Sequence, residues 1–420
     1  MKYENMKYGL IGNPLEHSFS PQIHALIGEY EYKLYPMPEA EVAPFLANCP
    51  LDALNVTIPY KETVIPCLSR ISEEAKRIGS VNTVVKEADG TLSGYNTDYF
   101  GFTAMLNYYG IDPKGKKVLV LGSGGASKTV RAVTSDMGAH AVIVISRSGE
   151  NNYENLYLHK DAEIIVNTTP LGMYPKNGIA AVNLQDFPNC EGVADIVYNP
   201  GKTALLLQAE EMGIKCAYGL SMLVAQAIKA AEYFFNTSYS DDVLPRVLSG
   251  VAAKMRNIVL VGMPGCGKST VGRMIADRLG REFLDTDAVI TEKTCRSPAE
   301  WITEFGEARF REIETEVLRD ITKQSGKVIA TGGGAVTVAE NKALLRQNGS
   351  VFFINRNIEL LSTEGRPLSG GIEIRRALYE KRLPMYRAFC DAEVLSDAST
   401  SAEDTAEQII ASFLKISERG

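Results

Sequence analysis

Short apolar runs rich in β-branched residues alternate with longer amphipathic segments along the whole chain. Strands separated by helical segments predict βαβ units, parallel sheets and an α/β fold. The runs that predict strands are 54–59, 116–122, 141–146, 162–169, 192–200, 257–262, 326–334 and 351–355.

A change in this pattern at residues 236–257 predicts a domain boundary. The segment lies between a helix that ends in "AEYFFN" and a fresh strand, and it carries Ser, Asp and Pro. Its apolar stretch "VLSGVAA" favours a packed connector over a loose tether. At 420 residues the chain is also too long for one ordinary core. We therefore expect one unit at 1–248 and another at 255–420.

Composition excludes several classes of partner. The chain is 45% hydrophobic and 23% charged, which is typical of a globular protein, and its net charge of −7 gives no footprint for nucleic acid or an anionic membrane. No uncharged apolar run approaches the roughly 18 residues of a membrane span, and the start lacks a signal-peptide pattern. The seven cysteines are scattered without a CxxC pair, which argues against a disulfide framework and a zinc site. We expect a cytoplasmic protein that acts on small molecules.

The stretch "LVGMPGCGKST", residues 260–270, predicts a nucleotide-phosphate loop. It satisfies G-x-x-x-x-G-K-[ST] between a predicted strand and a helical segment. In such a loop backbone N–H groups surround phosphate oxygens, the lysine reaches the β- and γ-phosphates, and the Ser hydroxyl binds Mg²⁺. The predicted ATP-binding residues are Gly262, Gly265, Gly267, Lys268, Ser269 and Thr270.

A carboxylate is the expected general base for an acceptor hydroxyl, because residues 251–420 contain no histidine. The stretch "FLDTD" supplies Asp285 and Asp287 at a predicted strand end. On a strand, positions i and i+2 face the same side, so one carboxylate could assist the metal while the other takes the proton. The alternative is a pair of acidic caps on a turn.

The motifs "GEARFREIE", "VIATGGGAV", "GRPLS" and "EKRLPMY" follow in order, and with the phosphate loop they resemble shikimate kinase over nearly the whole C-terminal segment. The resemblance implies a P-loop fold of the nucleoside-monophosphate-kinase type that transfers the ATP γ-phosphoryl group to the 3-hydroxyl of shikimate. It implies that Asp287 binds and deprotonates this hydroxyl and that Asp285 holds Mg²⁺ through water. Arg311 and Arg382 would grip the carboxylate of shikimate, since a guanidinium can meet a carboxylate through two hydrogen bonds.

The same resemblance assigns two further features of the kinase segment. Gly332, Gly333 and Gly334 match a glycine turn that lets the backbone approach the substrate ring, and Arg366 matches a lid arginine that closes over the phosphates.

An earlier glycine-rich stretch, "VLGSGGAS" at residues 120–127, predicts a dinucleotide-binding turn between a strand and a helix. Its pattern departs from strict G-x-G-x-x-G at Ser127. The expected contacts are Gly122, Gly124, Gly125 and Ala126. The next strand ends in Ser146 and Arg147 with no acidic residue for a ribose hydroxyl, which favours NADP over NAD.

Four polar clusters stand upstream of this turn. "NPLEHSFSPQIH" contains Ser18 and Ser20, "NVTIPYKE" contains Thr57 and Lys61, "GSVNTV" contains Asn82, and "GYNTDYFG" contains Asp98. Each has a structural alternative: Ser20 as a helix N-cap before Pro21, Lys61 as a solvated lysine, and Asn96 with Asp98 in an Asx turn.

Together these clusters resemble shikimate dehydrogenase, and "NTTPLGM", "DIVYNP" and "GLSMLVAQAI" extend the match to about residue 235. The resemblance implies a substrate domain (about 1–100, plus a returning helix at 220–236), a Rossmann-like NADP domain (about 101–219) and NADPH-dependent reduction of 3-dehydroshikimate. Ser18 and Ser20 would hold the substrate carboxylate. Lys61, oriented by Asp98, would donate the proton. The residues implied to bind the ring hydroxyls are Thr57, Asn82, Asp98 and Gln226.

The combined expectation is a bifunctional enzyme of aromatic amino-acid biosynthesis, in which the product of the first half is the substrate of the second. Two alternatives stay open at this point. One is a regulatory sensor that keeps both folds without catalysis, and the other is an enzyme with an altered substrate such as quinate.

Overall fold

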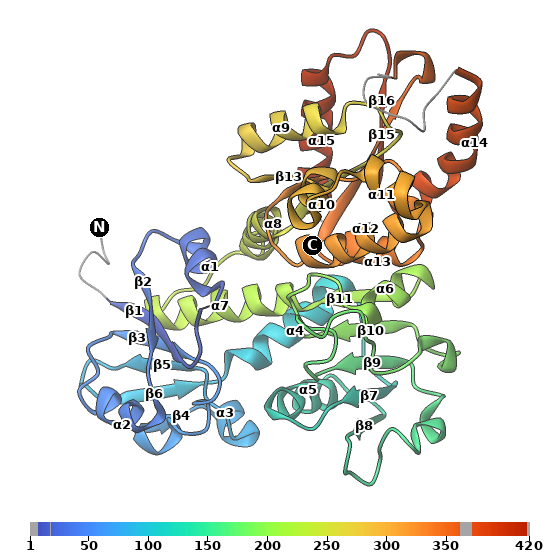
Figure 1. The fold of residues 1–420 in the computed structure, drawn as a ribbon. Helices are drawn as coiled ribbons and strands as arrows, with labels where there is room; N and C mark the ends of the chain where they lie inside the picture. The colour runs from blue at the N-terminus through green and yellow to red at the C-terminus, as the bar shows by residue number, and fades with distance from the viewer. Residues whose placement is uncertain (1–6, 17, 362–371, 418–420) are drawn as a thin grey trace.

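Three sheets follow one another along the chain in the computed structural model, which describes residues 7–16, 18–361 and 372–417 (Figure 1). Every strand expected from an apolar run is present, which confirms the α/β prediction. Within the described ranges, none of the helices has the length and apolar character that crossing a bilayer would take.

The first sheet has six strands in the order β2-β1-β3-β5-β6-β4. It is mixed, so the expectation of parallel sheets is wrong here: β3, β5 and β6 run antiparallel. The reason is a hairpin between β5 and β6, closed by a hydrogen bond from Glu87 N to Thr91 O of 2.8 Å. The elements of this unit are β1 (Tyr8–Gly12), α1 (Ser20–Ile27), β2 (Tyr32–Pro36), α2 (Glu39–Ala47), β3 (Ala53–Val56), η1 (Ile65–Cys67), β4 (Arg70–Ile71), α3 (Glu73–Ile78), β5 (Thr83–Lys86) and β6 (Leu92–Tyr95).

The second sheet is parallel throughout, in the order β11-β10-β9-β7-β8. Strand β7, which lies between β9 and β8, carries an apolar run from Val118 to Leu121 because both of its faces are buried. The elements are α4 (Thr97–Tyr109), β7 (Lys117–Leu121), α5 (Gly125–Asp136), β8 (Ala141–Ile145), η2 (Leu156–His159), β9 (Ile164–Asn167), η3 (Leu184–Asp186), β10 (Gly192–Asp195), α6 (Ala204–Glu211), β11 (Lys215–Tyr218) and α7 (Gly219–Phe235).

Helices α4 and α7 join the first two sheets. They pack closely because Gly101 of α4 has no side chain: a Cβ there would lie 2.8 Å from the carbonyl oxygen of Met222 and 3.0 Å from Cβ of Gln226. Helix α7 also packs on α1, β3 and β5 of the first unit, so it returns to that unit after the second sheet (Figure 1).

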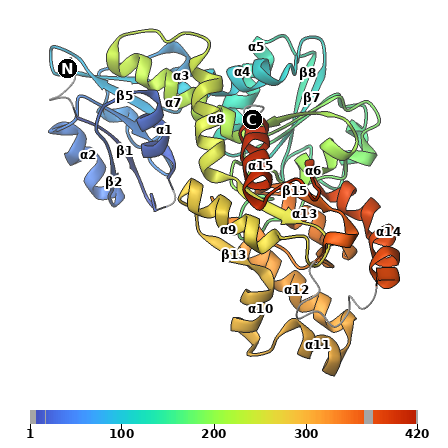
Figure 2. The same cartoon turned by 90° about the horizontal axis from the view of Figure 1, so that it is seen from above.

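Residues 236–257 form a packed connector, as expected. Most of the segment is helix α8 (Val243–Met255), which packs on α1 and α7 on one side and on the C-terminal helix α15 on the other (Figure 2). The proposed division between 1–248 and 255–420 therefore falls within a helix.

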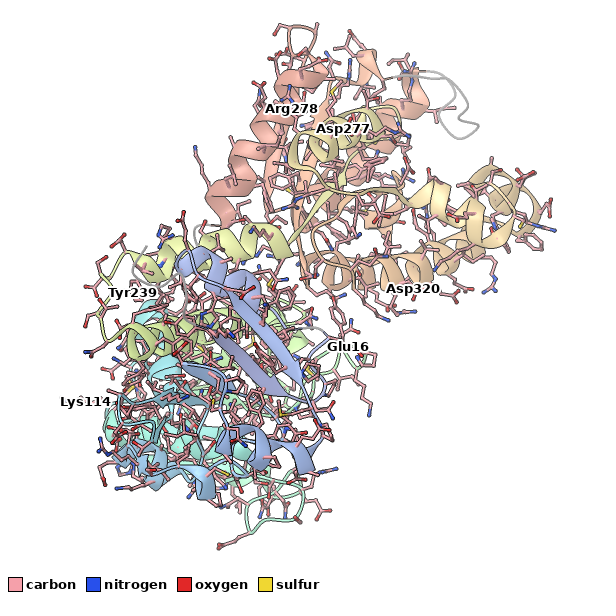
Figure 3. All side chains as sticks on the ribbon, turned by 90° about the vertical axis from the view of Figure 1, so that its left-hand side faces the viewer. Glu16, Lys114, Tyr239, Asp277, Arg278 and Asp320 are labelled. Atoms are coloured by element: carbon pink, nitrogen blue, oxygen red, sulfur yellow. The ribbon has the colours of Figure 1, made fainter. Side chains whose placement is uncertain are left out.

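The third sheet is also parallel, in the order β13-β14-β12-β15-β16. In Figure 3 its unit carries the labelled Asp277, Arg278 and Asp320, away from Lys114 of the second unit. The elements are β12 (Asn257–Val261), α9 (Lys268–Leu279), β13 (Phe283–Asp285), α10 (Thr286–Thr294), α11 (Pro298–Phe305), α12 (Glu307–Ile321), β14 (Val328–Ala330), η4 (Ala335–Thr337), α13 (Glu340–Arg346), β15 (Gly349–Arg356), η5 (Ile358–Leu360), α14 (Ile372–Phe389), β16 (Ala392–Ser396) and α15 (Ala402–Ser417).

The contact between α4 and α7 predicts a stability difference between two glycines. Gly101→Ala is expected to lower the free energy of unfolding by about 1–3 kcal/mol, because its methyl group has no room against α7. Gly125→Ala, at the start of α5 where a Cβ meets open space, is the matched control and should be neutral or slightly stabilising. Calorimetric unfolding of the two variants checks this, and equal stabilities would contradict the packing argument.

Candidate active sites

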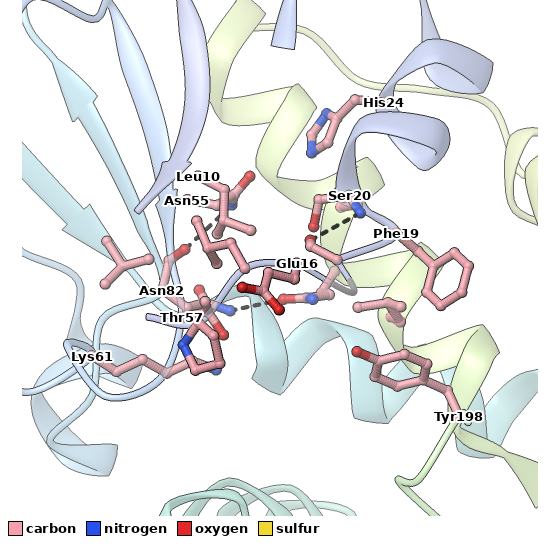
Figure 4. A pocket seen from close by; sticks show the side chains of 17 residues that line it. Leu10, Glu16, Phe19, Ser20, His24, Asn55, Thr57, Lys61, Asn82 and Tyr198 are labelled. Atoms are coloured by element: carbon pink, nitrogen blue, oxygen red, sulfur yellow. Dashed lines mark hydrogen bonds between the residues drawn. The ribbon is translucent and has the colours of Figure 1, made fainter. Parts of the chain in front are cut away.

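The first candidate site is a cavity of about 220 Å³ between the first sheet and α7 (Figure 4). Parallel strands β1 and β3 end at the same edge of the sheet, and the antiparallel β5 begins there, so the loops that meet at this edge carry polar side chains from distant positions. The predicted substrate and catalytic residues that line the cavity are Ser18, Ser20, Thr57, Lys61, Asn82 and Gln226.

Lys61 and Asp98 form an ion pair at this cavity. The Nζ–Oδ2 distance is 2.6 Å, and the side chains are 26% and 14% exposed. Asp98 lies in the first turn of α4, where the helix dipole favours a negative charge, and Asn96 caps the same helix by accepting from Tyr99 N at 3.1 Å. Lys61 is therefore paired with Asp98 and is not a free solvated lysine, and Asn96 is the N-cap of α4 where the sequence suggested an Asx turn with Asp98.

Asn82 links three parts of the site. Its Oδ1 accepts from Thr97 N at 2.7 Å, and its Nδ2 donates to Gln226 Oε1 at 3.0 Å (Figure 4). These bonds fix the amide of Asn82 between the start of α4 and the middle of α7.

Ser18 and Ser20 lie at the start of α1. Ser20 is the first residue of the helix, and the N-cap position is Phe19, which makes no side-chain cap bond. The N-cap alternative for Ser20 is therefore wrong, because Phe19 stands between it and the preceding loop. Ser18 Oγ accepts a hydrogen bond of 3.3 Å from Ser20 N.

The residues of this cavity that were not anticipated from the sequence include Asn55, His24 and Tyr198. Asn55 stands two positions before Thr57 on an extended segment, a spacing that places both on one face and could have identified it. Tyr198 comes from the quoted "DIVYNP" and packs edge-on against Phe19 at 6.2 Å.

His24 is held as a neutral ring. Burial lowers its pKa to about 3. The ring stacks on Tyr32 at 3.8 Å between centroids, and Nδ1 lies 2.5 Å from the hydroxyl of Tyr30. His24 therefore lines the cavity with an uncharged ring.

The second candidate site is the turn between β7 and α5. Gly122 adopts a φ of +103°, which favours glycine, and its N–H donates to Ile145 O at 2.8 Å. This bond places Ser146 and Arg147, which follow β8, beside the turn. At Gly124 and Gly125 an added Cβ would meet open space, so a ligand can approach the backbone at the start of α5, where Ala126 follows. The free N–H groups of a helix start suit a pyrophosphate.

The third candidate site is the loop between β12 and α9. Gly262, Gly265 and Gly267 have φ values of +151°, +85° and +96°, and α9 begins at Lys268. Lys268 Nζ lies over the loop and donates to the carbonyl oxygens of Gly262 at 2.9 Å and Met263 at 3.0 Å. The loop thus presents backbone N–H groups and an ammonium to the same space, with Thr270 in the first turn of the helix.

Asp285 and Asp287 adjoin this loop, but not as two residues of one strand. Asp285 ends β13 and caps α10, accepting from Asp287 N at 3.1 Å, so Asp287 already lies in the helix. The strand argument is therefore wrong, and the cap alternative describes Asp285. Ser269 Oγ donates to Asp285 Oδ2 at 2.6 Å, so the two predicted Mg²⁺ residues are neighbours. A hydroxyl and a carboxylate are oxygen ligands of the kind Mg²⁺ prefers.

Arg311 and Arg382 converge on the glycine turn that follows β14. Arg382 Nη1 donates to Gly333 O at 3.2 Å, and Arg311 packs against Gly334, where an added side chain would overlap its guanidinium. At Gly332 an added Cβ would lie 3.1 Å from Asp287 Oδ1. The turn therefore lies beside both arginines and the carboxylate of Asp287. The remaining predicted residue, Arg366, lies outside the described residues.

Glu314 is a further residue of this site that the sequence did not single out. It is fully buried, and its Oε2 accepts from Arg311 Nη1 at 2.7 Å. Burial raises the pKa of Glu314 against the opposing pull of Arg311. Its Oε1 has no partner among the described residues. The i, i+3 spacing of Arg311 and Glu314 in "GEARFREIE" is the signal that pairs them.

Comparison with known proteins assigns both halves. Residues 10–84 match the family model for the shikimate dehydrogenase substrate binding domain, and residues 264–414 match the model for shikimate kinase. The shikimate dehydrogenase (NADP(+)) of Clostridium beijerinckii is 40% identical over 245 residues, which cover 54% of this chain and 90% of that protein. The chain belongs to the shikimate dehydrogenase family. It also carries a shikimate kinase domain, so it is a bifunctional enzyme of the shikimate pathway.

Solved structures agree with this fold. A chorismate mutase/shikimate 5-dehydrogenase fusion protein from Clostridium acetobutylicum superposes with a TM-score of 0.56 at 35% identity, covering 59% of this chain and 97% of that one. The shikimate 5-dehydrogenase of Thermus thermophilus, in complex with NADP(H) and shikimate, gives 0.53 at 29% identity over 58% and 98%. The resemblances expected from the sequence are confirmed for both families.

In the shikimate dehydrogenase half, Asp195 holds the base of the loop that carries Tyr198. Its Oδ1 accepts from Val197 N and Asn167 Nδ2, both at 3.0 Å, and its Oδ2 accepts from Thr203 Oγ1 at 2.6 Å. Burial raises the pKa of Asp195 from 3.8 to about 6, although these hydrogen bonds oppose the shift.

This raised pKa predicts a pH-dependent contribution to stability. Because the folded state favours the neutral carboxyl, the contribution is complete below about pH 4 and is lost as pH rises through about 6. Between these pH values the free energy of unfolding of the wild type should therefore contain a pH-dependent change of up to about 3 kcal/mol that Asp195→Asn removes. Urea unfolding of both proteins at pH 4, 5, 6 and 7 measures the difference, and parallel pH profiles would contradict the assignment.

Proposed function

We propose that the chain reduces 3-dehydroshikimate to shikimate with NADPH and then phosphorylates the 3-hydroxyl of shikimate with ATP and Mg²⁺. The ion pair of Lys61 and Asp98 at a cavity with polar lining is the observation that carries the proposal. Its ammonium group would supply the proton that a ketone reduction needs. The family names support the choice of substrates, since the dehydrogenase relatives are named for shikimate and NADP(+).

The cavity can bind the substrate through groups of matched chemistry. Ser18 and Ser20 lie at the start of α1, where hydroxyl groups and helix N–H groups favour a carboxylate. Thr57, Asn82 and Gln226 stand on the other side and suit the ring hydroxyls. Tyr198, which follows β10 of the second sheet, also lines the cavity.

Proton transfer by Lys61 completes the reduction. A hydride added to the carbonyl carbon leaves an alkoxide on the oxygen, which the Lys61 ammonium stabilises and protonates. Asp98 fixes the direction of Nζ through the 2.6 Å contact. NADPH supplies the hydride when it is bound at the turn of Gly122, Gly124, Gly125 and Ala126. Arg147 and Ser146 would meet its 2′-phosphate.

The kinase site is suited to position and deprotonate the shikimate hydroxyl. Arg311 and Arg382 would hold the carboxylate beside Gly333, and Asp287 would accept the proton of the 3-hydroxyl. Lys268 and the loop from Gly262 to Thr270 would hold the ATP phosphates. Ser269 and Asp285 would hold Mg²⁺, which neutralises charge that develops during phosphoryl transfer.

Removal of Lys61 tests the reductase. Lys61→Ala is expected to lower kcat for NADPH-dependent reduction of 3-dehydroshikimate by about 10²–10⁴, while phosphorylation of added shikimate continues at the wild-type rate. Lys76→Ala, an exposed lysine paired with Glu73, is the control and should leave both rates unchanged. Full reductase activity in Lys61→Ala would exclude Lys61 as the proton donor.

Asp287→Asn makes the complementary test of the kinase. Phosphorylation of shikimate is expected to fall by about 10²–10⁴ because the hydroxyl loses its base, and NADPH consumption should be unchanged. The control is Asp277→Asn, an exposed residue of α9. A kinase rate near that of the wild type would remove Asp287 from the mechanism.

A further inference from the structure

One residue of the kinase half, Gln347, contacts two loops of the dehydrogenase half, one through its side chain and the other through its backbone carbonyl. Its Oε1 accepts from Asn177 Nδ2 at 2.7 Å, and its backbone carbonyl accepts from Lys202 N at 2.7 Å. Its Nε2 donates to Thr322 Oγ1 at 3.3 Å within the kinase half. Gln347 is 4% exposed, so its side chain is buried where the two halves meet.

The loop that contains Lys202 runs from Ile196 to Thr203 and also carries Tyr198. Asp195 binds Val197 at its beginning and Thr203 at its end, so the base of the loop is fixed. Its outer part is fixed by the bond of Lys202 to Gln347. Tyr198, between these anchors, lines the proposed substrate cavity.

The second loop, residues 168–178, approaches the dinucleotide turn. Thr168 Oγ1 donates to Leu121 O at 2.7 Å. A Cβ added to Gly122 would lie 2.9 Å from Thr168 Oγ1. The far end of this loop carries Asn177, which binds Gln347, and Tyr174, whose hydroxyl donates to Thr322 O at 3.3 Å. Kinase contacts therefore hold the ends of both loops that reach the dehydrogenase site.

An ionic network surrounds Gln347 and strengthens the contact. Glu210 of α6 accepts from Lys202 at 2.7 Å, from Tyr218 at 2.6 Å and from Arg346 of α13 at 3.2 Å. Lys342 of α13 pairs with Glu211 at 2.8 Å. Figure 1 shows α13 lying along α6 and β11, where these pairs form.

The contact is remote from the kinase's own chemistry. Gln347 precedes β15, at the amino ends of a parallel sheet, whereas the phosphate loop, Asp285 and the glycine turn follow the carboxyl ends of β12, β13 and β14. A five-residue strand such as β12 spans about 16 Å, which separates the two edges. A change at Gln347 should therefore affect the other half more than its own.

We propose that Gln347 of the kinase half is a positioning residue for the dehydrogenase reaction. Its side-chain bond to Asn177 fixes the loop that carries Thr168 beside the dinucleotide turn, and its backbone carbonyl holds the loop that carries Tyr198. The proposal rests on the proposed function, since it presumes that this turn binds NADPH. It makes the kinase half a structural part of the dehydrogenase site in addition to its own activity.

The test compares Gln347→Ala with the wild type in the full chain. Gln347→Ala removes the side-chain bond to Asn177 and keeps the backbone bond to Lys202, so the KM for NADPH should rise by about three- to tenfold, the range of one hydrogen bond, with kcat changed less than twofold. Both kinase constants should stay at their wild-type values. A purely structural role would lower the active fraction and hence kcat without moving KM. Gln408→Ala, an exposed glutamine of α15, is the matched control.

Asn177→Ala provides a second variant that leaves the kinase half intact and should raise KM in the same way. The double variant should show no further increase, because both changes remove one shared hydrogen bond. An unchanged KM in both single variants would overturn the proposal. Absence of reductase activity in the wild type would instead contradict the proposed function, so the two failures are distinguishable.

Discussion

The close packing of α4 against α7 is the contact on which the dehydrogenase site depends. Gly101 allows the two helices to approach until α4 touches the backbone and Cβ atoms of α7. One turn before Gly101, α4 begins with Asn96 as its cap and presents Asp98 to Lys61. On the facing helix Gln226 accepts from Asn82, which in turn accepts from Thr97. A shift of either helix would separate groups that the proposed chemistry needs within hydrogen-bond distance.

The fusion adds the kinase without disturbing this arrangement. Helix α8 continues from the dehydrogenase half and packs on both halves, while α13 and Gln347 contact α6 and the loops that carry Asn177 and Lys202. The dehydrogenase half therefore contacts the amino ends of the kinase strands, and the kinase's phosphate loop opens at their carboxyl ends.

Much of this architecture could be predicted from local sequence. Apolar runs located most strands of the two parallel sheets, and strict spacing located the phosphate loop, because both depend on residues that are neighbours in the chain. The failures have a common physical cause. Asp287 lies on a helix because the side chain of Asp285 caps that helix by accepting from Asp287 N. The alternating pattern of a strand does not reveal such a cap.

Residues that act through tertiary contacts were also missed. Tyr198 reaches the cavity only because its loop folds back toward Phe19, and Glu314 depends on its burial beside Arg311. Gln347 is an unremarkable glutamine in the sequence, and its position between two halves follows from domain packing. The mixed first sheet likewise resulted from a hairpin that the alternation of strands and helices did not indicate.

The most direct test of the central claim is to incubate the purified chain with 3-dehydroshikimate, NADPH, ATP and Mg²⁺ and to identify the products by mass. The account predicts shikimate 3-phosphate, with shikimate accumulating alone when ATP is omitted. If NADPH is not consumed and added shikimate is not phosphorylated, the claim that one chain catalyses two consecutive steps is contradicted.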